Sequence, residues 1–156
     1  MKRLFPIFMV IVMASVAGRL LLAQSDPHVG TWKLNLAKSK YDPGPPPQSL
    51  MRTWEPSGKV SVEGVSGAGK PTAYGYTVKG DGKDYPTTGA IPNGADTIAT
   101  KRIDANTFEA AFKRGGKQVE TVTFAVSKDG KVLTILAKGT NPNGQPFDNL
   151  TVWDKQ

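Results

Sequence analysis

The sequence contains no cysteine among its 156 residues. Disulfide bonds are therefore excluded, as are a cysteine nucleophile and a lipid attached to a lipoprotein-type cysteine. An exported domain without disulfides must be held together by its own hydrophobic core. A domain of this length can bury enough apolar surface to do so.

Histidine is almost as scarce, since His28 is the only one. A Cys–His pair and a histidine-rich metal cluster are excluded. A Ser-His-Asp triad would have to recruit His28 from a lead-in that we expect to be flexible. Glu109 and Glu120 flank a predicted hairpin, but Glu109 falls on the polar side of its strand and is better explained as a solvated charge. We therefore predict no catalytic residues, no metal, no cofactor and no enzyme activity.

Long hydrophobic runs are missing except at the N-terminus. There, a basic start precedes an uncharged run over residues 4–18, and small residues follow. This pattern is typical of a secretory signal peptide, with cleavage after Ala17 or Ala23. A retained membrane anchor is the alternative, but Arg19 ends the run short of the roughly 20 residues that a spanning helix needs. We expect a soluble mature chain, exported to the periplasm or outside the cell.

A concentrated basic surface is also missing. Without the signal peptide (residues 1–23), the 20 Lys and Arg residues fall to 17 against 13 acidic residues, so the net charge falls from +7 to +4. The remaining basic residues are scattered singly over residues 24–156, which have the length of one domain. Nucleic-acid binding needs a clustered basic face, preferably with stacking aromatic residues. We therefore predict no nucleic-acid partner.

No segment has a convincing helical period. Instead, apolar and polar residues alternate, beginning with residues 29–36, where Trp32, Leu34 and Leu36 share one face. Glycine-rich turns separate about ten such segments. They lie near residues 29–36, 48–54, 60–62, 74–78, 84–88, 96–103, 107–113, 118–126, 132–137 and 147–154.

Short connections between these segments predict sequential antiparallel neighbours. Closure would remove the exposed edges of so long a meander. We therefore predict an all-β fold, an antiparallel up-and-down barrel of about 8–10 strands, with a two-sheet sandwich as the alternative.

Two connections carry other patterns. Residues 64–70 match the start of a phosphate-binding loop, but Pro71 stands where Ser or Thr would reach Mg²⁺, and a strand is predicted to follow instead of a helix. We interpret this segment as a hairpin turn. The proline-rich stretch over residues 43–47 is predicted to be a stiff, extended connector.

The first predicted strand also carries a family pattern. Gly30-Thr31-Trp32 resembles the Gly-x-Trp signature of the calycins, which include lipocalins and fatty-acid-binding proteins. Residues 149–155 resemble the last strand of the fatty-acid-binding proteins. The resemblance implies a lipocalin-like barrel over residues 24–156. In that family the last strand carries an Arg and a Tyr that hold a ligand carboxylate, but Thr151 and Trp153 stand there. The family's helical lid is also missing, so the resemblance does not carry over fatty acid as the ligand.

Several residues on the predicted inward faces could line a cavity. An apolar ligand would bury aromatic surface, and tyrosine hydroxyls would provide polar contacts. Alternatively, the same side chains could simply fill the barrel. Arg52 is in phase with Leu50 and Trp54, and could bind an anion, stack on Trp32 as a structural cap or lie at the rim. The candidate ligand-binding residues are Trp32, Arg52, Trp54, Tyr74, Tyr76, Phe108, Phe112 and Phe124.

These observations predict an exported, non-catalytic binding protein for a small, largely apolar ligand held inside the barrel. An interaction or structural module with a filled core is the alternative. An enzyme that uses carboxylates and tyrosines is a further one, and would require carboxylates that converge in the cavity with shifted pKa values.

Overall fold

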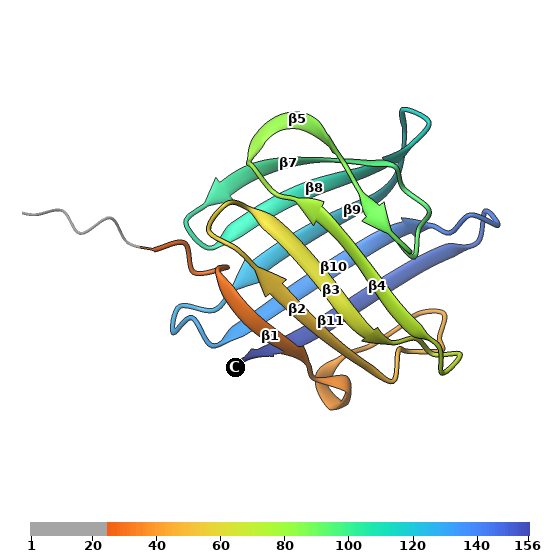
Figure 1. The fold of residues 1–156 in the computed structure, drawn as a ribbon, viewed down its shortest axis with the longest axis horizontal. Coiled ribbons are helices and arrows are strands. Elements are labelled where there is room, and N and C mark those ends of the chain that lie inside the picture. The colour runs from red at the N-terminus through yellow and green to blue at the C-terminus, as the bar shows by residue number, and fades with distance from the viewer. Residues whose placement is uncertain (1–24) are drawn as a thin grey trace, which may run out of the picture.

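The computed structural model describes residues 25–156, and the predicted signal peptide, residues 1–23, lies outside them. Eleven antiparallel strands form a nearly closed barrel, as predicted, with one short 3-10 helix η1 (Leu36–Lys38) (Figure 1). The strands are β1 (Gly30–Leu34), β2 (Ser49–Trp54), β3 (Lys59–Val65), β4 (Pro71–Thr77), β5 (Asp81–Pro86), β6 (Thr88–Gly89), β7 (Thr97–Asp104), β8 (Thr107–Arg114), β9 (Lys117–Val126), β10 (Val132–Thr140) and β11 (Pro146–Lys155).

The first and last strands lie side by side. β1 pairs with β11, with Trp32 opposite Lys155, and its other edge pairs with β2, with Trp32 opposite Arg52. The remaining neighbours follow in chain order from β2 to β4 and from β7 to β11. Because β1 joins these two halves, a continuous hydrogen-bonded sheet runs around most of the barrel.

The barrel closes at a seam that differs from the predicted meander. The sequence predicts a single short strand over residues 84–88, but the chain there divides between the two edges of the sheet. β5 pairs with β7 at one edge, and β6 pairs with β4 at the other. The added two-residue strand raises the strand number to eleven. Thr87 alone separates β5 from β6. The chain therefore crosses directly from one edge of the sheet to the other, although no strand pairing joins these two edges.

Inward-facing residues form one apolar core. Trp32, Val60, Ile98 and Leu133 are fully buried, and the core includes most of the inward residues that the alternation predicts. Burial of each large apolar side chain contributes about 1.5–3 kcal/mol to folding. With no disulfide, this core holds the barrel together.

The turns follow the predicted glycine positions. Gly115 and Gly116, between β8 and β9, both have positive φ (57° and 79°), as a two-residue turn matched to the strand twist requires. Residues 66–70 form the tight connection between β3 and β4 and are followed by a strand, so the hairpin interpretation of residues 64–70 is confirmed.

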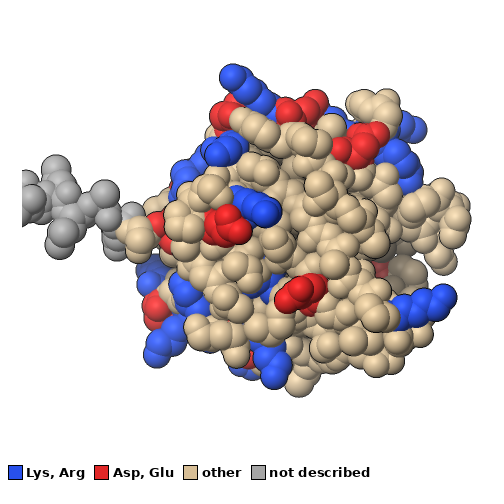
Figure 2. Space-filling view, in the orientation of Figure 1, with Lys and Arg blue, Asp and Glu red and all other residues tan. Residues whose placement is uncertain are grey.

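Charged side chains are dispersed over the surface. On the face shown in Figure 2, Lys and Arg alternate with Asp and Glu, mostly around the margin. Within residues 25–156, no helix has the length and apolar character needed to cross a membrane.

Candidate ligand-binding cavity

One end of the barrel contains a cavity of about 410 Å³. In Figure 1 this is the right-hand end, where the β10–β11 hairpin and the segment before β2 lie. The inner faces of β2, β4, β8, β9, β10 and β11 form its wall. The apolar wall residues include Leu50, Phe112, Val122, Phe124, Ile135, Ala137, Phe147 and Trp153.

The proline-rich segment lies at the mouth of this cavity. Pro43, Pro45 and Pro47 are among its lining residues. The segment is attached to β11 by the backbone bond from Asp148 N–H to Asp42 O (2.7 Å), and Gln48 N–H donates to Val65 O (2.9 Å). The segment predicted as a connector therefore also forms part of the mouth of the cavity.

Arg52 extends from β2 into the cavity. Its side chain is buried (4% exposed), because position 52 has the same inward phase as Leu50 and Trp54. The guanidinium carbon lies 4.7 Å from the centre of the Trp153 ring, and Nη1 donates a hydrogen bond to the Tyr76 hydroxyl. Arg52 therefore points into the barrel and stacks on Trp153, not on Trp32 as one of the sequence alternatives had it.

Three tyrosine side chains line the same cavity. Burial raises the pKa of Tyr41 to about 12, although the positive charge of Arg52 opposes the shift. Burial also raises the pKa of Tyr74 and of Tyr76, again against the charge of Arg52. All three hydroxyls are consequently protonated at neutral pH and can donate hydrogen bonds.

A carboxyl group also lines the cavity. Glu120 of β9 accepts a hydrogen bond from the Asn93 amide, which belongs to the loop between β6 and β7. Asn93 Oδ1 accepts from Ala95 N–H (2.8 Å), and Asn93 O accepts from Arg114 Nη1 (3.2 Å), so the loop is attached to the wall. Burial raises the pKa of Glu120 to about 7, although the hydrogen bond from Asn93 opposes the shift.

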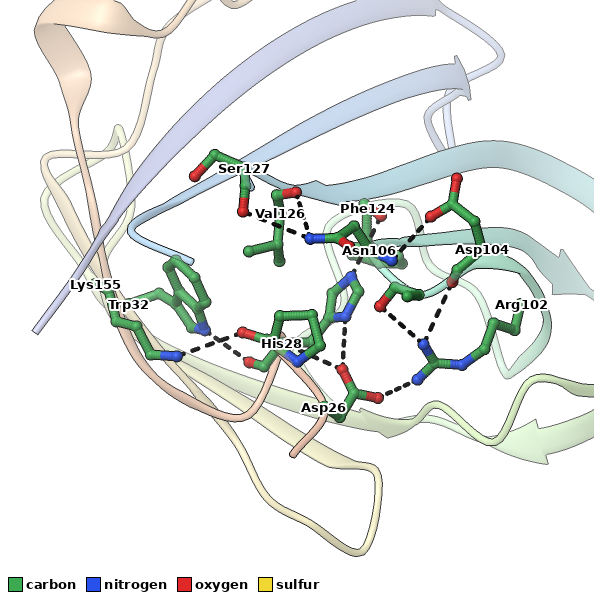
Figure 3. A network of polar contacts seen from close by, with 12 residues as sticks. Asp26, His28, Trp32, Arg102, Asp104, Asn106, Phe124, Val126, Ser127 and Lys155 are labelled. Carbon is green, nitrogen blue, oxygen red and sulfur yellow. Dashed lines mark hydrogen bonds and ion pairs between the residues drawn. The ribbon is translucent and has the colours of Figure 1, made fainter. Parts of the chain in front are cut away.

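The other end of the barrel is closed by the lead-in before β1 (Figure 3). His28 is fully buried there, so the prediction of a flexible end is wrong for this residue. Its backbone N–H and Nδ1 both lie within hydrogen-bond distance of Asp26 Oδ1, at 3.0 and 2.8 Å, and its backbone O accepts from Trp32 Nε1 at 2.8 Å. Asp26 also forms an ion pair with Arg102 of β7.

Aromatic rings complete this closed end. The His28 ring centre lies 4.8 Å from that of Trp54 and 4.9 Å from that of Phe108. The guanidinium carbon of Arg102 lies 4.2 Å from the centre of the Phe108 ring. The lead-in is therefore a folded plug that covers the core.

The structure divides the eight candidate residues between the two ends. Arg52, Tyr74, Tyr76, Phe112 and Phe124 line the cavity. The other three candidates, Trp32, Trp54 and Phe108, belong to the closed end, around His28.

Sequence reasoning missed several other residues of the cavity. Alternation could have placed Trp153 and Glu120 on the inner face, because each is in phase with inward residues of its own strand. Trp153 is in phase with Thr151, and Glu120 is in phase with Val122 and Phe124. Asn93 and Tyr41 lie outside the strands, so alternation could not have placed them.

Within residues 25–156, no group of three His, Cys, Asp or Glu side chains is placed to hold a metal ion. No protein-family model matches the chain, and no curated protein sequence matches it. Functional interpretation therefore depends on the geometry of the cavity.

Proposed function

We propose that the mature chain is an exported, non-catalytic binding protein that holds a small, largely apolar molecule inside the barrel. The observation that carries this proposal is the cavity of about 410 Å³ at the open end. Small-molecule sites in proteins have volumes of roughly 300–1,000 Å³ and are mostly apolar, with a few polar groups that fix orientation. Here aromatic and aliphatic side chains form most of the wall, while Arg52 and the tyrosine hydroxyls provide the polar contacts.

A catalytic role is less well supported by the same geometry. Within residues 25–156, Glu120 is the only Asp or Glu that lines the cavity. Its raised pKa makes it a titratable group near neutral pH, but acid–base chemistry on two sides of a substrate needs a second positioned group. Glu120 also already has a structural role, because it accepts the hydrogen bond from Asn93.

The first test is native mass spectrometry of the protein purified from its own host. A bound small molecule in a fixed ratio would support the proposal. If no molecule co-purifies and a panel of lipophilic compounds produces no thermal shift, the binding function is wrong, and the interaction module with a filled core becomes the better hypothesis.

A matched pair of variants then locates the site. Ala137 lines the cavity from β10, whereas Ala111 of β8 alternates with the buried residues Ala110 and Phe112 and points outward. In the variant Ala137→Phe an added ring would occupy ligand space, so we expect affinity to fall at least about tenfold. The variant Ala111→Phe adds the same ring outside the barrel and should leave affinity unchanged. Equal affinities for both variants would place the bound molecule elsewhere.

A further inference from the structure

Glu120 is an acidic side chain set into an apolar part of the cavity wall. Val122, the next inward residue of β9, and Phe112, opposite Glu120 on β8, both line the cavity beside it. The Glu120 side chain is half-buried, and its accessible part faces the cavity, because it has the inward phase of Val122 and Phe124. A ligand that covers this apolar wall therefore also covers the carboxyl.

The two neighbouring strands are fitted to this position. On one side Glu120 pairs with Phe112 of β8, but the next residue of β8, Lys113, pairs with Gln118, so the pairing skips one residue of β9. Such bulges re-aim side chains and are common beside functional sites. On the other side Glu120 pairs with Gly139 of β10, which has no titratable group, and a Cβ atom there would come within 2.8 Å of the Glu120 Cα atom. The strand geometry thus fixes the carboxyl in the wall.

No protein cation is paired with this carboxyl. Among the described residues, no Lys, Arg or His lies within ion-pair distance of Glu120. Its hydrogen-bond partner is the amide of Asn93, whose Oδ1 is already bonded to Ala95 N–H, so the amide presents its donor to Glu120. An ionised carboxylate has about four acceptor sites, and this one donor leaves the others to water in the cavity.

The other ionisable groups around Glu120 keep their protonation state near neutral pH. Burial raises the pKa of Tyr74 and of Tyr76 on β4, the charge of Arg52 opposes the shift, and the negative charge of Glu120 adds to it. Both hydroxyls therefore stay protonated. Arg52 of β2 lines the same cavity, and Arg114 of β8 is bonded to the loop between β6 and β7. Since arginine does not lose its proton in proteins, Glu120 is the group of this wall that changes charge near neutral pH.

We propose that ligand binding is coupled to proton uptake at Glu120: an uncharged ligand displaces water from the carboxylate, so it binds preferentially to the protein in which Glu120 is protonated. This inference rests on the proposed binding function and concerns the regulation of that same site. Removal of water disfavours the charged form of a carboxyl. Because linkage is reciprocal, a ligand that favours protonation binds less tightly once the proton is lost. The proton is taken from the solvent on binding and returns to it on release.

The coupling gives the pH dependence of binding a definite sign. Burial raises the pKa of Glu120 to about 7 in the ligand-free protein, and a ligand that excludes water raises it further. Well below pH 7 the carboxyl is protonated in both states, and the affinity is highest. As pH rises above about 7 the ligand-free protein ionises first, so the affinity falls, by up to about tenfold for each unit between the two pKa values. Alkaline conditions therefore favour release.

Calorimetric titration with octan-1-ol tests the coupling, because this probe has no group that ionises between pH 6 and pH 9. Where another uncharged compound of the lipophile panel binds more tightly, it replaces octan-1-ol. We expect the dissociation constant to rise at least about tenfold from pH 6 to pH 9. At pH 7.5, titrations in two buffers with different enthalpies of ionisation should show uptake of about half a proton or more per ligand.

The outcomes separate this inference from the binding function. An affinity that is independent of pH or rises with pH, without proton uptake, overturns the coupling but leaves the binding function intact. If neither octan-1-ol nor any compound of the panel binds at any pH, the binding function itself is wrong.

Two variants assign the coupling to Glu120. Glu120→Gln keeps an oxygen that can accept from Asn93 but cannot ionise, so its affinity should be the same from pH 6 to pH 9, with no proton taken up. Glu109→Gln removes a carboxyl from the exposed outer face of β8 and should keep the full pH dependence of the parent. A pH dependence that persists in Glu120→Gln, or is lost in Glu109→Gln, places the coupling at another group and overturns the assignment.

Discussion

At the closed end of the barrel the polar groups bond one another, whereas at the open end one buried polar atom has no partner among the described residues. Asp26 bonds His28 and pairs with Arg102, and the Trp32 indole N–H bonds the His28 carbonyl. At the open end, Arg52 is 4% exposed, and its Nε has no hydrogen-bond partner within residues 25–156. Both ends use aromatic rings around a nitrogen-rich side chain. Under the proposed function, the closed end serves folding and the open end is completed by a ligand.

The largest expected effect compares two phenylalanines on the same strand. Phe108 and Phe112 of β8 are almost equally buried (4% and 5% exposed), but Phe108 packs on His28 and Trp54 while Phe112 lines the cavity. We expect Phe108→Ala to lower the free energy of unfolding by about 3–5 kcal/mol, because it leaves a void in a packed core. Phe112→Ala enlarges an existing cavity and should cost only about 1–2 kcal/mol. Urea denaturation of both variants measures the difference, and equal losses would show that the open end is packed as tightly as the closed end.

The next effect concerns Glu120 and pH. Its pKa is about 7 in the folded protein, against 4.5 for an unperturbed glutamate carboxyl, which represents the unfolded chain. Between these pH values the folded state therefore holds a proton that the unfolded state has released. The free energy of unfolding should therefore fall as pH rises from about 4.5 to 7 and stay lower above it. Glu120→Gln keeps an oxygen that can accept from Asn93 and removes the ionisation. We expect the variant to be more stable than the parent by about 1–3 kcal/mol at pH 8.

The control for this experiment is Glu109→Gln, which removes a carboxyl from the exposed outer face of β8. Thermal or urea unfolding at a series of pH values should show the same decline between pH 4.5 and 7 in the control as in the parent. A decline that persists in Glu120→Gln would mean that another group causes it.

The inward face of each strand could be predicted from the sequence. The alternation put Trp32, Trp54, Phe108 and Phe124 inside, and all are buried. Alternation has a period of two and reports only which face a side chain occupies. It contains no information on height along the barrel axis, which depends on strand tilt and stagger. Residues of the closed end and of the cavity therefore could not be told apart.

The closed end depends on a contact between two segments that lie far apart in the sequence. His28 precedes β1, yet its Nε2 lies 3.4 Å from the carbonyl oxygen of Phe124 in β9. No local pattern predicts that a lead-in folds back over a barrel end. Glu120 is a different case, because its phase with Val122 and Phe124 indicates an inward carboxyl. The sequence analysis considers it only as a pair with Glu109, whose polar position favours a solvated charge.

The smallest effect tests whether the plug is structural. Burial opposes ionisation of Asp26, but hydrogen bonds from His28 and the charges of His28 and Arg102 outweigh it and lower the pKa of Asp26. This stabilisation is present above the unfolded-state pKa and is lost as pH falls through the lower folded-state pKa. We expect Asp26→Ala to lower the free energy of unfolding at pH 7 by about 1–2 kcal/mol.

The matched variant Asp84→Ala breaks a more exposed ion pair with Lys113 (2.8 Å) and should cost about 0–1 kcal/mol. Because Asp26 is not among the residues that line the cavity, ligand affinity should be unchanged in both variants. A loss of affinity in Asp26→Ala alone would show that the two ends of the barrel are coupled.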